Sequence, residues 1–246
     1  MNWTDEGLLL SVKPHGEKSA IIQVFTKTKG LHSGIIQNGF SRKMNSTLQP
    51  STQLHLNWSS RLEEHLGNYK IDLLKTRADI LIGNKLALDT FNALSSLCIT
   101  TLAERDPMPE FYKITIKFLD QIRIQKRWEF LYLDWELHLL SSIGYGLDLK
   151  KCVASGTTEN LFYISPKSGK AVSKEKGLKY DKKLLRFPNI LRAIKKDNEF
   201  SRSDLVLGLS ITGFFLKKWL TYSLQNSQTM MIRQRLIDTL SNEENT

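Results

Sequence analysis

The sequence has little of what covalent stabilisation or membrane insertion requires. Only two of its 246 residues are cysteines, Cys98 and Cys152. They lie far apart in the chain, which argues against a disulfide framework and indicates a reducing compartment. No apolar run approaches the length of a membrane-spanning helix, and Asp5 and Glu6 interrupt the N-terminus before an apolar leader could form. We therefore expect a soluble, cytoplasmic protein.

The common patterns of catalysis and metal binding are also missing. None of the five histidines forms an i, i+4 pair around a carboxylate, and there is no phosphate-binding G-x-x-x-x-G-K-[ST] loop. After Cys152 the chain contains no further cysteine or histidine that could complete a zinc tetrahedron. We expect a protein that is not an enzyme and that needs no metal or cofactor. A nucleic-acid enzyme with carboxylates brought together from distant elements stays open as an alternative.

The N-terminal part, from Gly7 to Lys75, contains a series of short β segments separated by turn residues. In Gln53–Trp58 apolar and polar residues alternate strictly, which places Trp58 on the core face and His55 on the outer face. Five such segments are typical of an OB-type barrel. They are Leu8–Val12, Ala20–Phe25, Leu31–Gln37, Gln53–Trp58 and Tyr69–Leu74.

From Asn84 onward the apolar residues recur at helical spacing. Ser201 is a good N-cap for one of these helices, and Asp204, three residues later, is its acidic partner. The segment 148–183 is irregular, and within it Leu161–Ile164 can pair with Ala171–Val172 as a hairpin. The residues after 240 contain no apolar side chain and are expected to fray. The predicted helices are 84–102, 110–125, 128–144, 188–196, 201–225 and 229–240.

We therefore predict an α+β protein with two domains. Residues 1–80 form an OB-fold β-barrel that binds nucleic acid. Residues 81–246 form an all-helical C-terminal domain with a small, zinc-free hairpin insertion. Trp128 and Trp135 lie on an apolar helical stripe and are interpreted as packing residues.

Positive charge is concentrated in one part of the chain. The formal net charge is +10, and the span from Lys167 to Lys196 holds eleven cations against only two acids, Glu175 and Asp181. Attraction for a polyanion is therefore expected here, although a solvated surface has the same composition. The loop Gly39–Ser46 adds an aromatic and two cations to the barrel, a composition that suits a phosphate backbone and stacked bases. The candidate nucleic-acid contacts are Lys29, Phe40, Arg42, Lys43, Lys167, Lys170, Lys174, Lys182 and Lys183.

Two blocks of the sequence resemble the RecO family of bacterial recombination mediators. The second block runs from Trp135 through Gly144-Tyr145-Gly146 to Cys152 and resembles the start of that family's C-terminal domain. Many relatives carry paired C-x-x-C motifs in the irregular region, of which this chain keeps only Cys152. The first block resembles the family's N-terminal barrel and consists of Trp3–Gly7, Glu17-x-Ser19, Val24–Thr26, Gly30, Asn38–Gly39, Arg42–Lys43 and Leu48–Pro50.

The resemblance implies a function in DNA repair by homologous recombination, at the nucleoid. Such a protein binds single- and double-stranded DNA, anneals complementary strands, and with RecR helps to load RecA onto DNA coated with single-stranded-DNA-binding protein (SSB). The family also binds the acidic, apolar-ended tail of SSB in its helical domain. Arg123, Lys126 and Arg127 are the cations expected to serve that tail, although the acidic Asp134 stands where relatives often carry a basic residue. An RNA-binding OB-fold protein of the translation apparatus is the alternative.

Overall fold

A computed structural model describes residues 1–192, 200–220 and 228–242, without the side chain of Lys43. The chain divides into two compact units. The first comprises residues 1–123 and 228–236, and the second comprises residues 124–227 and 237–246. The predicted domain boundary near residue 80 stays a prediction.

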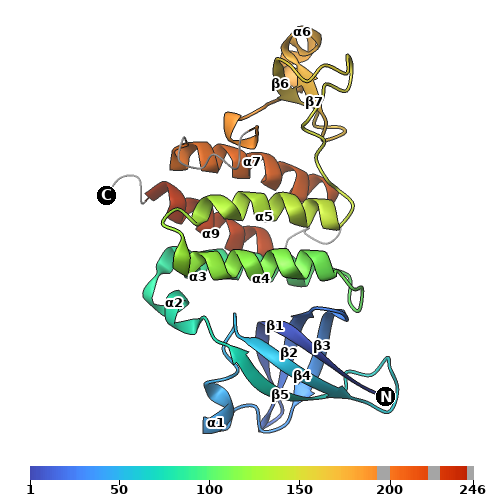
Figure 1. Cartoon of the computed structure of the whole chain (residues 1–246), viewed down its shortest axis with the longest axis vertical. Helices are drawn as coiled ribbons and strands as arrows, with labels where there is room; N and C mark the ends of the chain where they lie inside the picture. Colours follow the sequence, from blue (N-terminus) through green and yellow to red (C-terminus); the bar gives the residue numbers. More distant parts are fainter. Residues whose placement is uncertain (193–199, 221–227, 243–246) are drawn as a thin grey trace. The chain divides into compact units, whose positions relative to one another are not determined.

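The first unit contains the expected barrel (Figure 1). Its five strands close in the order β1-β2-β3-β5-β4, and β1 pairs with both β2 and β4. All pairs are antiparallel except β3 with β5. The predicted OB-type architecture is therefore confirmed. The strands are β1 (Asn2–His15), β2 (Ser19–Thr26), β3 (Gly30–Ile36), β4 (Gln53–Ser59) and β5 (Asn68–Lys75).

Strand β1 is much longer than the predicted segment Leu8–Val12. Its first half pairs with β4 and its second half with β2, and the register shifts between Leu9 and Ser11. The first residues of the strand are largely polar and include Asp5 and Glu6, so hydrophobic alternation did not predict this extension. A bulge of this kind bends a strand and increases its twist, which lets one strand close both edges of a barrel.

The barrel core confirms the alternation read from the sequence. Leu54, Leu56 and Trp58 are buried, and the indole nitrogen of Trp58 donates to the carbonyl oxygen of Leu66 at 3.0 Å. His55 lies on the other face and is half-buried. Gly67 has a φ of 65°, and a Cβ there would stand 2.3 Å from the Trp58 ring. The buried indole therefore requires glycine at this turn.

The connection between β3 and β4 contains a short helix, α1 (Arg42–Asn45), where the sequence analysis expected a loop. The Ser41 side chain accepts a hydrogen bond from the Met44 backbone nitrogen and caps the helix. Leu48 belongs to the barrel core, and Met44 packs against it. The segment is therefore anchored on one side and exposed on the other.

Helices complete the first unit. The predicted helices 84–102 and 110–125 are confirmed, and the Asn84 side chain caps α3 by accepting from the Ala87 nitrogen at 3.0 Å. The predicted helix 229–240 is also confirmed, and it extends through Ser241 and Asn242, which were expected to fray. Residues 243–246 lie outside the described part. The helices are α2 (Ala78–Gly83), which the sequence analysis missed, α3 (Lys85–Thr101), α4 (Pro109–Ile124) and α9 (Gln228–Asn242), the last of which continues into the second unit.

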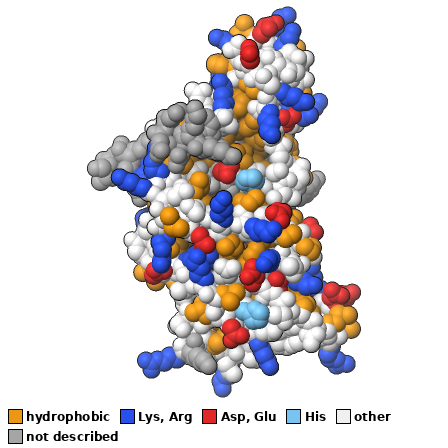
Figure 2. Space-filling model, in the orientation of Figure 1, with side chains coloured by type: hydrophobic (Ala, Val, Ile, Leu, Met, Phe, Trp, Pro, Cys, Tyr) orange, Lys and Arg blue, Asp and Glu red, His pale blue; other side chains and the backbone are white. Residues whose placement is uncertain are grey.

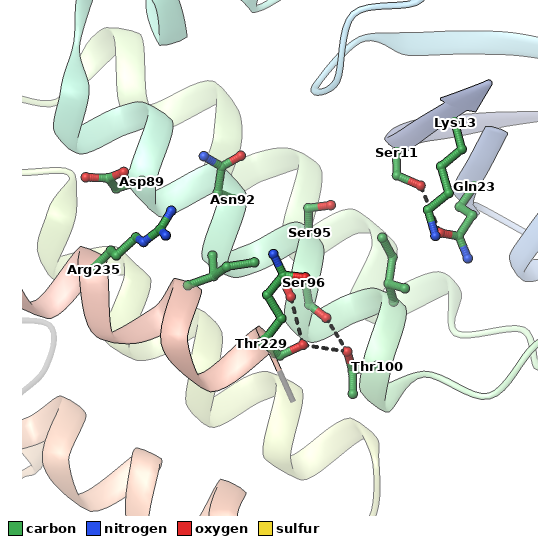
Figure 3. A pocket seen from close by; sticks show the side chains of 13 residues that line it. Ser11, Lys13, Gln23, Asp89, Asn92, Ser95, Ser96, Thr100, Thr229 and Arg235 are labelled. Carbon is green, nitrogen blue, oxygen red and sulfur yellow. Dashed lines mark hydrogen bonds between the residues drawn. The ribbon is translucent and has the colours of Figure 1, made fainter. Parts of the chain in front are cut away.

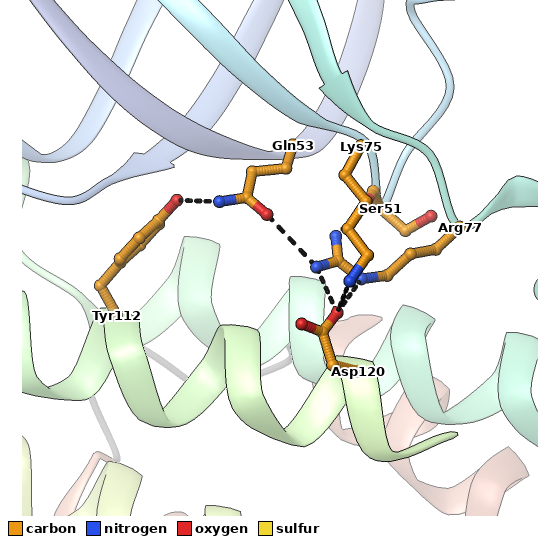
Figure 4. Close-up of polar contacts among 6 residues, drawn as sticks. All are labelled: Ser51, Gln53, Lys75, Arg77, Tyr112 and Asp120. Carbon is orange, nitrogen blue, oxygen red and sulfur yellow. Dashed lines mark hydrogen bonds and ion pairs between the residues drawn. The ribbon is translucent and has the colours of Figure 1, made fainter. Parts of the chain in front are cut away.

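A buried arginine joins the barrel to α4 (Figure 4). Arg77 is 3% exposed, and its guanidinium donates to Asp120 at 2.6 and 3.0 Å and to the Ser51 carbonyl oxygen at 3.2 Å. Lys75 donates to the same carboxylate at 2.8 Å. Burial alone would raise the pKa of Asp120, but the hydrogen bonds from Lys75 and Arg77 lower it below its usual value. We call Arg77 and Asp120 the barrel clamp.

The second unit combines helices with a small sheet. The Ser201 capping box is present, and Thr212 donates to the fully buried Glu136 at 2.6 Å between α7 and α5. Trp128 and Trp135 are buried, as predicted. The helices are α5 (Glu129–Ser142), α6 (Lys174–Gly177) and α7 (Arg202–Trp219), with 3₁₀ turns η1 (Leu178–Lys183) and η2 (Asn189–Leu191).

Two features of this unit differ from the prediction, and helix α7 confirms it in the described part. The hairpin exists, as β6 (Leu161–Ile164) and β7 (Ala171–Ser173), but a third strand, β8 (Leu185–Arg186), extends it in the order β7-β6-β8. The predicted helix 188–196 is only the 3₁₀ turn η2 where the structure describes it, because Pro188 is extended; residues 193–196 lie outside. Helix α7 confirms the prediction for 201–225 as far as Trp219, and residues 221–225 also lie outside. Such short elements bury too few residues to leave a periodic signal.

Within the described ranges, no helix is both long and apolar enough to cross a membrane.

We expect Asp120→Ala to lower the free energy of unfolding by about 2 to 3 kcal/mol, because it leaves the buried Arg77 guanidinium without its carboxylate. Asp79→Ala is the matched control, since Asp79 pairs with Arg123 of the same helix α4 but both side chains are more than half exposed. Its loss should be below about 1 kcal/mol. Urea unfolding monitored by tryptophan fluorescence measures both values. Equal losses of unfolding free energy in the two variants would contradict a stabilising ion pair between Arg77 and Asp120.

Candidate nucleic-acid interface

The predicted contacts on the barrel do not form one cluster. Lys29 lies in the turn between β2 and β3, where Thr26 pairs with Gly30. Phe40 and Arg42 follow the other end of the same hairpin, where Ala20 pairs with Ile36. The seven residues of β3 separate the two ends by about 20 Å, at about 3.3 Å per residue. The structure therefore brings Phe40 and Arg42 together and leaves Lys29 apart.

Phe40 and Arg42 are both available to solvent. The Phe40 ring is 48% exposed, and Arg42 is exposed in the first turn of α1. The side chain of Lys43 lies outside the described part. An exposed aromatic ring beside a cation is suited to stacking on an unpaired base next to a phosphate.

The Lys29 end of the barrel holds a buried aromatic cluster. His32 is 4% exposed, and its Nδ1 lies 2.7 Å from the Tyr69 hydroxyl oxygen. Trp3 stacks on Trp58 with ring centroids 5.5 Å apart and meets the His32 ring edge-on at 5.0 Å. Burial, aided by the positive charges of Arg105 and Lys29 and opposed by a hydrogen bond at Ser33, lowers the pKa of His32 to about 4. His32 is therefore neutral at physiological pH and contributes no positive charge.

The second unit carries the predicted lysine surface, which we define as Lys167, Lys170, Lys174, Lys182 and Lys183. All five side chains are exposed, in the β6–β7 turn, at the start of α6 and at the end of η1. Figure 2 shows Lys and Arg side chains gathered over this small sheet beside a few acidic ones.

The two acids of this segment are already engaged by other groups. Asp181 accepts from Arg186 at 2.7 Å and from the Tyr163 hydroxyl at 2.8 Å. Glu175 lies 3.6 Å from its neighbour Lys176. Within the ranges that the structure describes, neither acid is paired with any of the five lysines. The lysine surface therefore keeps its positive potential.

Aromatic residues that the sequence analysis did not consider lie among these lysines. Tyr180 is 58% exposed at a kink in η1, between Lys179 and Lys182 in the sequence. The Phe162 ring lies under both Arg186 and Lys174, at 4.9 and 5.5 Å from its centroid. An aromatic placed between cations in the sequence was the available signal for Tyr180.

The three cations proposed for an acidic tail have different surroundings. Arg123 belongs to the first unit and pairs with Asp79. Arg127 belongs to the second unit, where its guanidinium lies 4.1 Å from the Phe130 ring centroid and donates to the Phe200 carbonyl oxygen. Lys126 is exposed. The guanidinium groups of Arg123 and Arg127 thus both have structural partners.

A pocket in the second unit was missed altogether. It has a volume of about 570 Å³, and its lining combines leucines with two cations, Lys150 and Arg192. The sequence offered no signal, because the lining comes from four separate segments between residues 137 and 192. The leucines are Leu137, Leu147, Leu149, Leu161 and Leu191.

The surroundings of Cys152 do not fit zinc. In the described part of the chain, no three His, Cys, Asp or Glu side chains lie together as metal ligands. Instead the Cys152 sulfur accepts a hydrogen bond from the Ser173 nitrogen at 3.2 Å. Burial alone would raise its pKa, but hydrogen bonds from Ser155, Ser173 and Ala154 lower it to about 6. Backbone and hydroxyl dipoles thus favour the anionic form of this sulfur.

Comparison with known proteins gives consistent matches over the whole chain. Residues 1–77 match the family model "Recombination protein O N terminal", and residues 90–226 match "Recombination protein O C terminal". A "DNA repair protein RecO" from Ruegeria sp. (strain TM1040) is 42% identical over 241 residues, which cover 98% of this chain and 99% of that relative. Relatives of the same name from Dinoroseobacter shibae and Jannaschia sp. are each 38% identical, over 98% and 99% of this chain and 98% of each relative.

The closed barrel, the helices and the exposed cations define an OB-fold protein of the kind that acts as a binding module. The chain belongs to the RecO family of DNA repair proteins. The resemblance noted in the sequence is therefore confirmed, and the match extends past residue 170 to residue 226.

The buried His32 makes the stability of the first unit depend on pH. The folded state binds the His32 proton with a pKa of about 4, below the ordinary value of 6.5, so the unfolded state takes up the proton first as the pH falls. Stability is therefore lost between pH 6.5 and 4, by about 3 kcal/mol in total at about 1.4 kcal/mol per unit. His32→Gln should flatten this dependence in urea unfolding, whereas the control His15→Gln, at an exposed position, should retain it.

Proposed function

We propose that this chain is a recombination mediator that binds single- and double-stranded DNA and anneals complementary strands. With RecR it helps RecA to replace SSB on single-stranded DNA, in the cytoplasm at the nucleoid. The family membership and the unneutralised lysine surface support this proposal. The barrel contacts are Lys29, at one end of the β2–β3 hairpin, and Phe40, Arg42 and Lys43, at the other.

The mechanism requires no bond chemistry, and we assign no catalytic residue. Two DNA strands repel each other through their phosphates, and cations placed between them reduce that repulsion by releasing condensed counterions. The lysine surface supplies such cations on exposed, flexible side chains. The bases then pair by themselves once the strands are held close together. A nucleic-acid enzyme would instead require carboxylates converging on a metal.

The pocket lined by Leu147, Lys150 and Arg192 is our candidate for the SSB tail. A peptide that ends in apolar side chains and carries carboxylates needs an apolar slot with cations at its rim. The leucines and the two cations of the pocket supply that combination. The stretch Arg123–Arg127 fits less well, because Arg123 is already paired with the carboxylate of Asp79. We therefore propose the pocket, in place of that stretch, as the binding site for the SSB tail.

Annealing of two complementary oligonucleotides, one of them coated with SSB, tests the function. We expect the protein to accelerate annealing, and the acceleration to require the SSB tail. Lys182→Ala with Lys183→Ala should weaken binding to bare single strands and reduce the salt slope by about 1.4, at about 0.7 per phosphate contact. The control is Lys113→Ala with Lys117→Ala, which removes two exposed cations from α4. No acceleration, or tighter binding to RNA than to DNA, would favour the RNA-binding alternative.

Substitutions of two adjacent lysines test whether this pocket binds the SSB tail. Lys150→Ala removes a cation that lines the pocket, whereas Lys151→Ala removes the next cation, which is exposed but does not line it. Fluorescence anisotropy with an SSB-tail peptide should show an affinity loss of about fivefold or more for Lys150→Ala and little change for Lys151→Ala, since one charge-assisted contact contributes about 1 kcal/mol or more. A loss confined to Lys126→Ala would return the site to the stretch originally predicted.

A further inference from the structure

The first unit contains a polar groove that none of the predicted contacts occupies (Figure 3). It has a volume of about 450 Å³ and lies between the outer face of β1 and β2 and the helices α3 and α9. Every lining residue belongs to the first unit. A cavity of this size can hold one or two nucleotides but not a duplex, since sites for small molecules measure roughly 300 to 1,000 Å³.

Most lining residues have polar side chains, with cations toward the two ends, and Ile99 and Ile232 add apolar surface. Figure 3 shows Lys13 and Arg235 at opposite ends, with Ser95, Ser96 and Thr229 between them. The hydroxyl oxygen of Thr229 lies 2.8 Å from the hydroxyl oxygens of Ser96 and Thr100, which joins α9 to α3. The groove walls are therefore held in place by the fold rather than by a ligand.

Apart from Ile99 and Ile232, the neutral lining residues carry hydrogen-bonding side chains. The Ser11 hydroxyl donates to Oε1 of Gln23 at 2.8 Å, which orients that amide and leaves its NH₂ group as the donor. Asn92 and Gln228 add two more amides. Amide and hydroxyl side chains together with Lys and Arg are the groups that contact phosphates and sugars in nucleic-acid complexes, and amides also bind base edges.

The acid in the groove is matched by a cation. Asp89 is the one carboxylate among the lining residues, and Lys85 donates to it at 2.6 Å. With Lys13 and Arg235, the groove and its rim have a net positive charge. An anionic ligand is therefore favoured over a cationic one.

The Lys13 end of the groove continues toward the barrel loop that carries Phe40 and Arg42. Lys13 pairs with Ile21, and the next pair along β1 and β2 is Pro14 with Ala20. A Cβ on Gly39 would meet the Ala20 Cβ at 2.7 Å, so the loop packs at this end of β2. The β1–β2 turn there presents the exposed Lys18 beside the exposed Glu17. Arg42, Lys18 and Lys13 therefore belong to segments that meet at the same end of β2.

We propose that this groove binds a short stretch of single-stranded nucleic acid, whose phosphates contact Lys13 and Arg235 while its sugars and base edges contact the amides and hydroxyls between them. The site rests on the proposed function and specifies where the barrel unit holds its strand. It selects single strands, because the bases must leave a duplex to enter a groove of this volume.

Binding of oligo(dT) at several salt concentrations tests the site in the full-length chain. Lys13→Ala with Arg235→Ala should reduce the salt slope by about 1.4 and weaken affinity several-fold, at about 0.7 per phosphate contact on a single strand. Lys113→Ala with Lys117→Ala removes the same charge from exposed positions on α4 and is the matched control. The slope of the control should equal that of the wild type.

Asn92→Glu provides a second variant that keeps both cations. Asn92 is exposed, so the substitution should not disturb folding, and the new carboxylate would repel a phosphate backbone inside the groove. We expect weaker oligo(dT) binding and little change in binding to a blunt duplex. Lys113→Glu is its control, because it places a carboxylate outside the groove.

Two outcomes would overturn the site. Oligo(dT) binding by both groove variants that equals that of their controls would reject it and leave the proposed function intact, provided that the wild-type chain still anneals DNA. Loss of binding to the acidic SSB-tail peptide, with oligo(dT) binding unchanged, would reassign the groove to a peptide. Failure of the wild-type chain to bind DNA at all would instead remove the proposed function on which the site rests.

Discussion

The pairing of β1 with two partners is the constraint on which the rest of the first unit depends. One strand of fourteen residues closes the barrel by hydrogen bonding to β4 with its first half and to β2 with its second. This closure leaves the barrel without a free edge, which would otherwise be open to pairing with other chains. It also fixes the outer face of β1 and β2 against α3, where Ser95 donates to the Leu10 carbonyl oxygen at 2.9 Å.

The two units differ in where their charged side chains lie and in how these are paired. In the first unit the buried Arg77 is paired with Asp120, and the exposed cations lie on both the barrel and the helices, with Lys29 and Arg42 at opposite ends of one hairpin. In the second unit the acids of the small sheet are held by Arg186 and Lys176, so the lysine surface remains positive. The proposed function would benefit from two such surfaces, because a localised contact and a diffuse one differ in their dependence on salt.

The small sheet of the second unit is stabilised by contacts among its own residues. Three short strands cannot bury much apolar surface, yet Tyr163 is 1% exposed, and a Cβ on Gly177 would stand 2.3 Å from its ring. The Tyr163 hydroxyl binds Asp181, and that carboxylate binds Arg186 of β8. Packing of one aromatic ring, one ion pair and a hydrogen bond to the Cys152 sulfur thus hold these strands together.

The sequence by itself determined the local structure and the family. Strict alternation predicted the strand that buries Trp58, helical spacing predicted α3, α4 and α5, and ordered motifs indicated RecO, because these signals depend only on neighbouring residues. Tertiary structure decided which residues share a site. It placed Lys29 and Arg42 at opposite ends of one hairpin, brought Thr229 to Ser96, and assembled the leucine pocket around Lys150. Such arrangements depend on strand register and on contacts between distant segments, and no local pattern of residues specifies either.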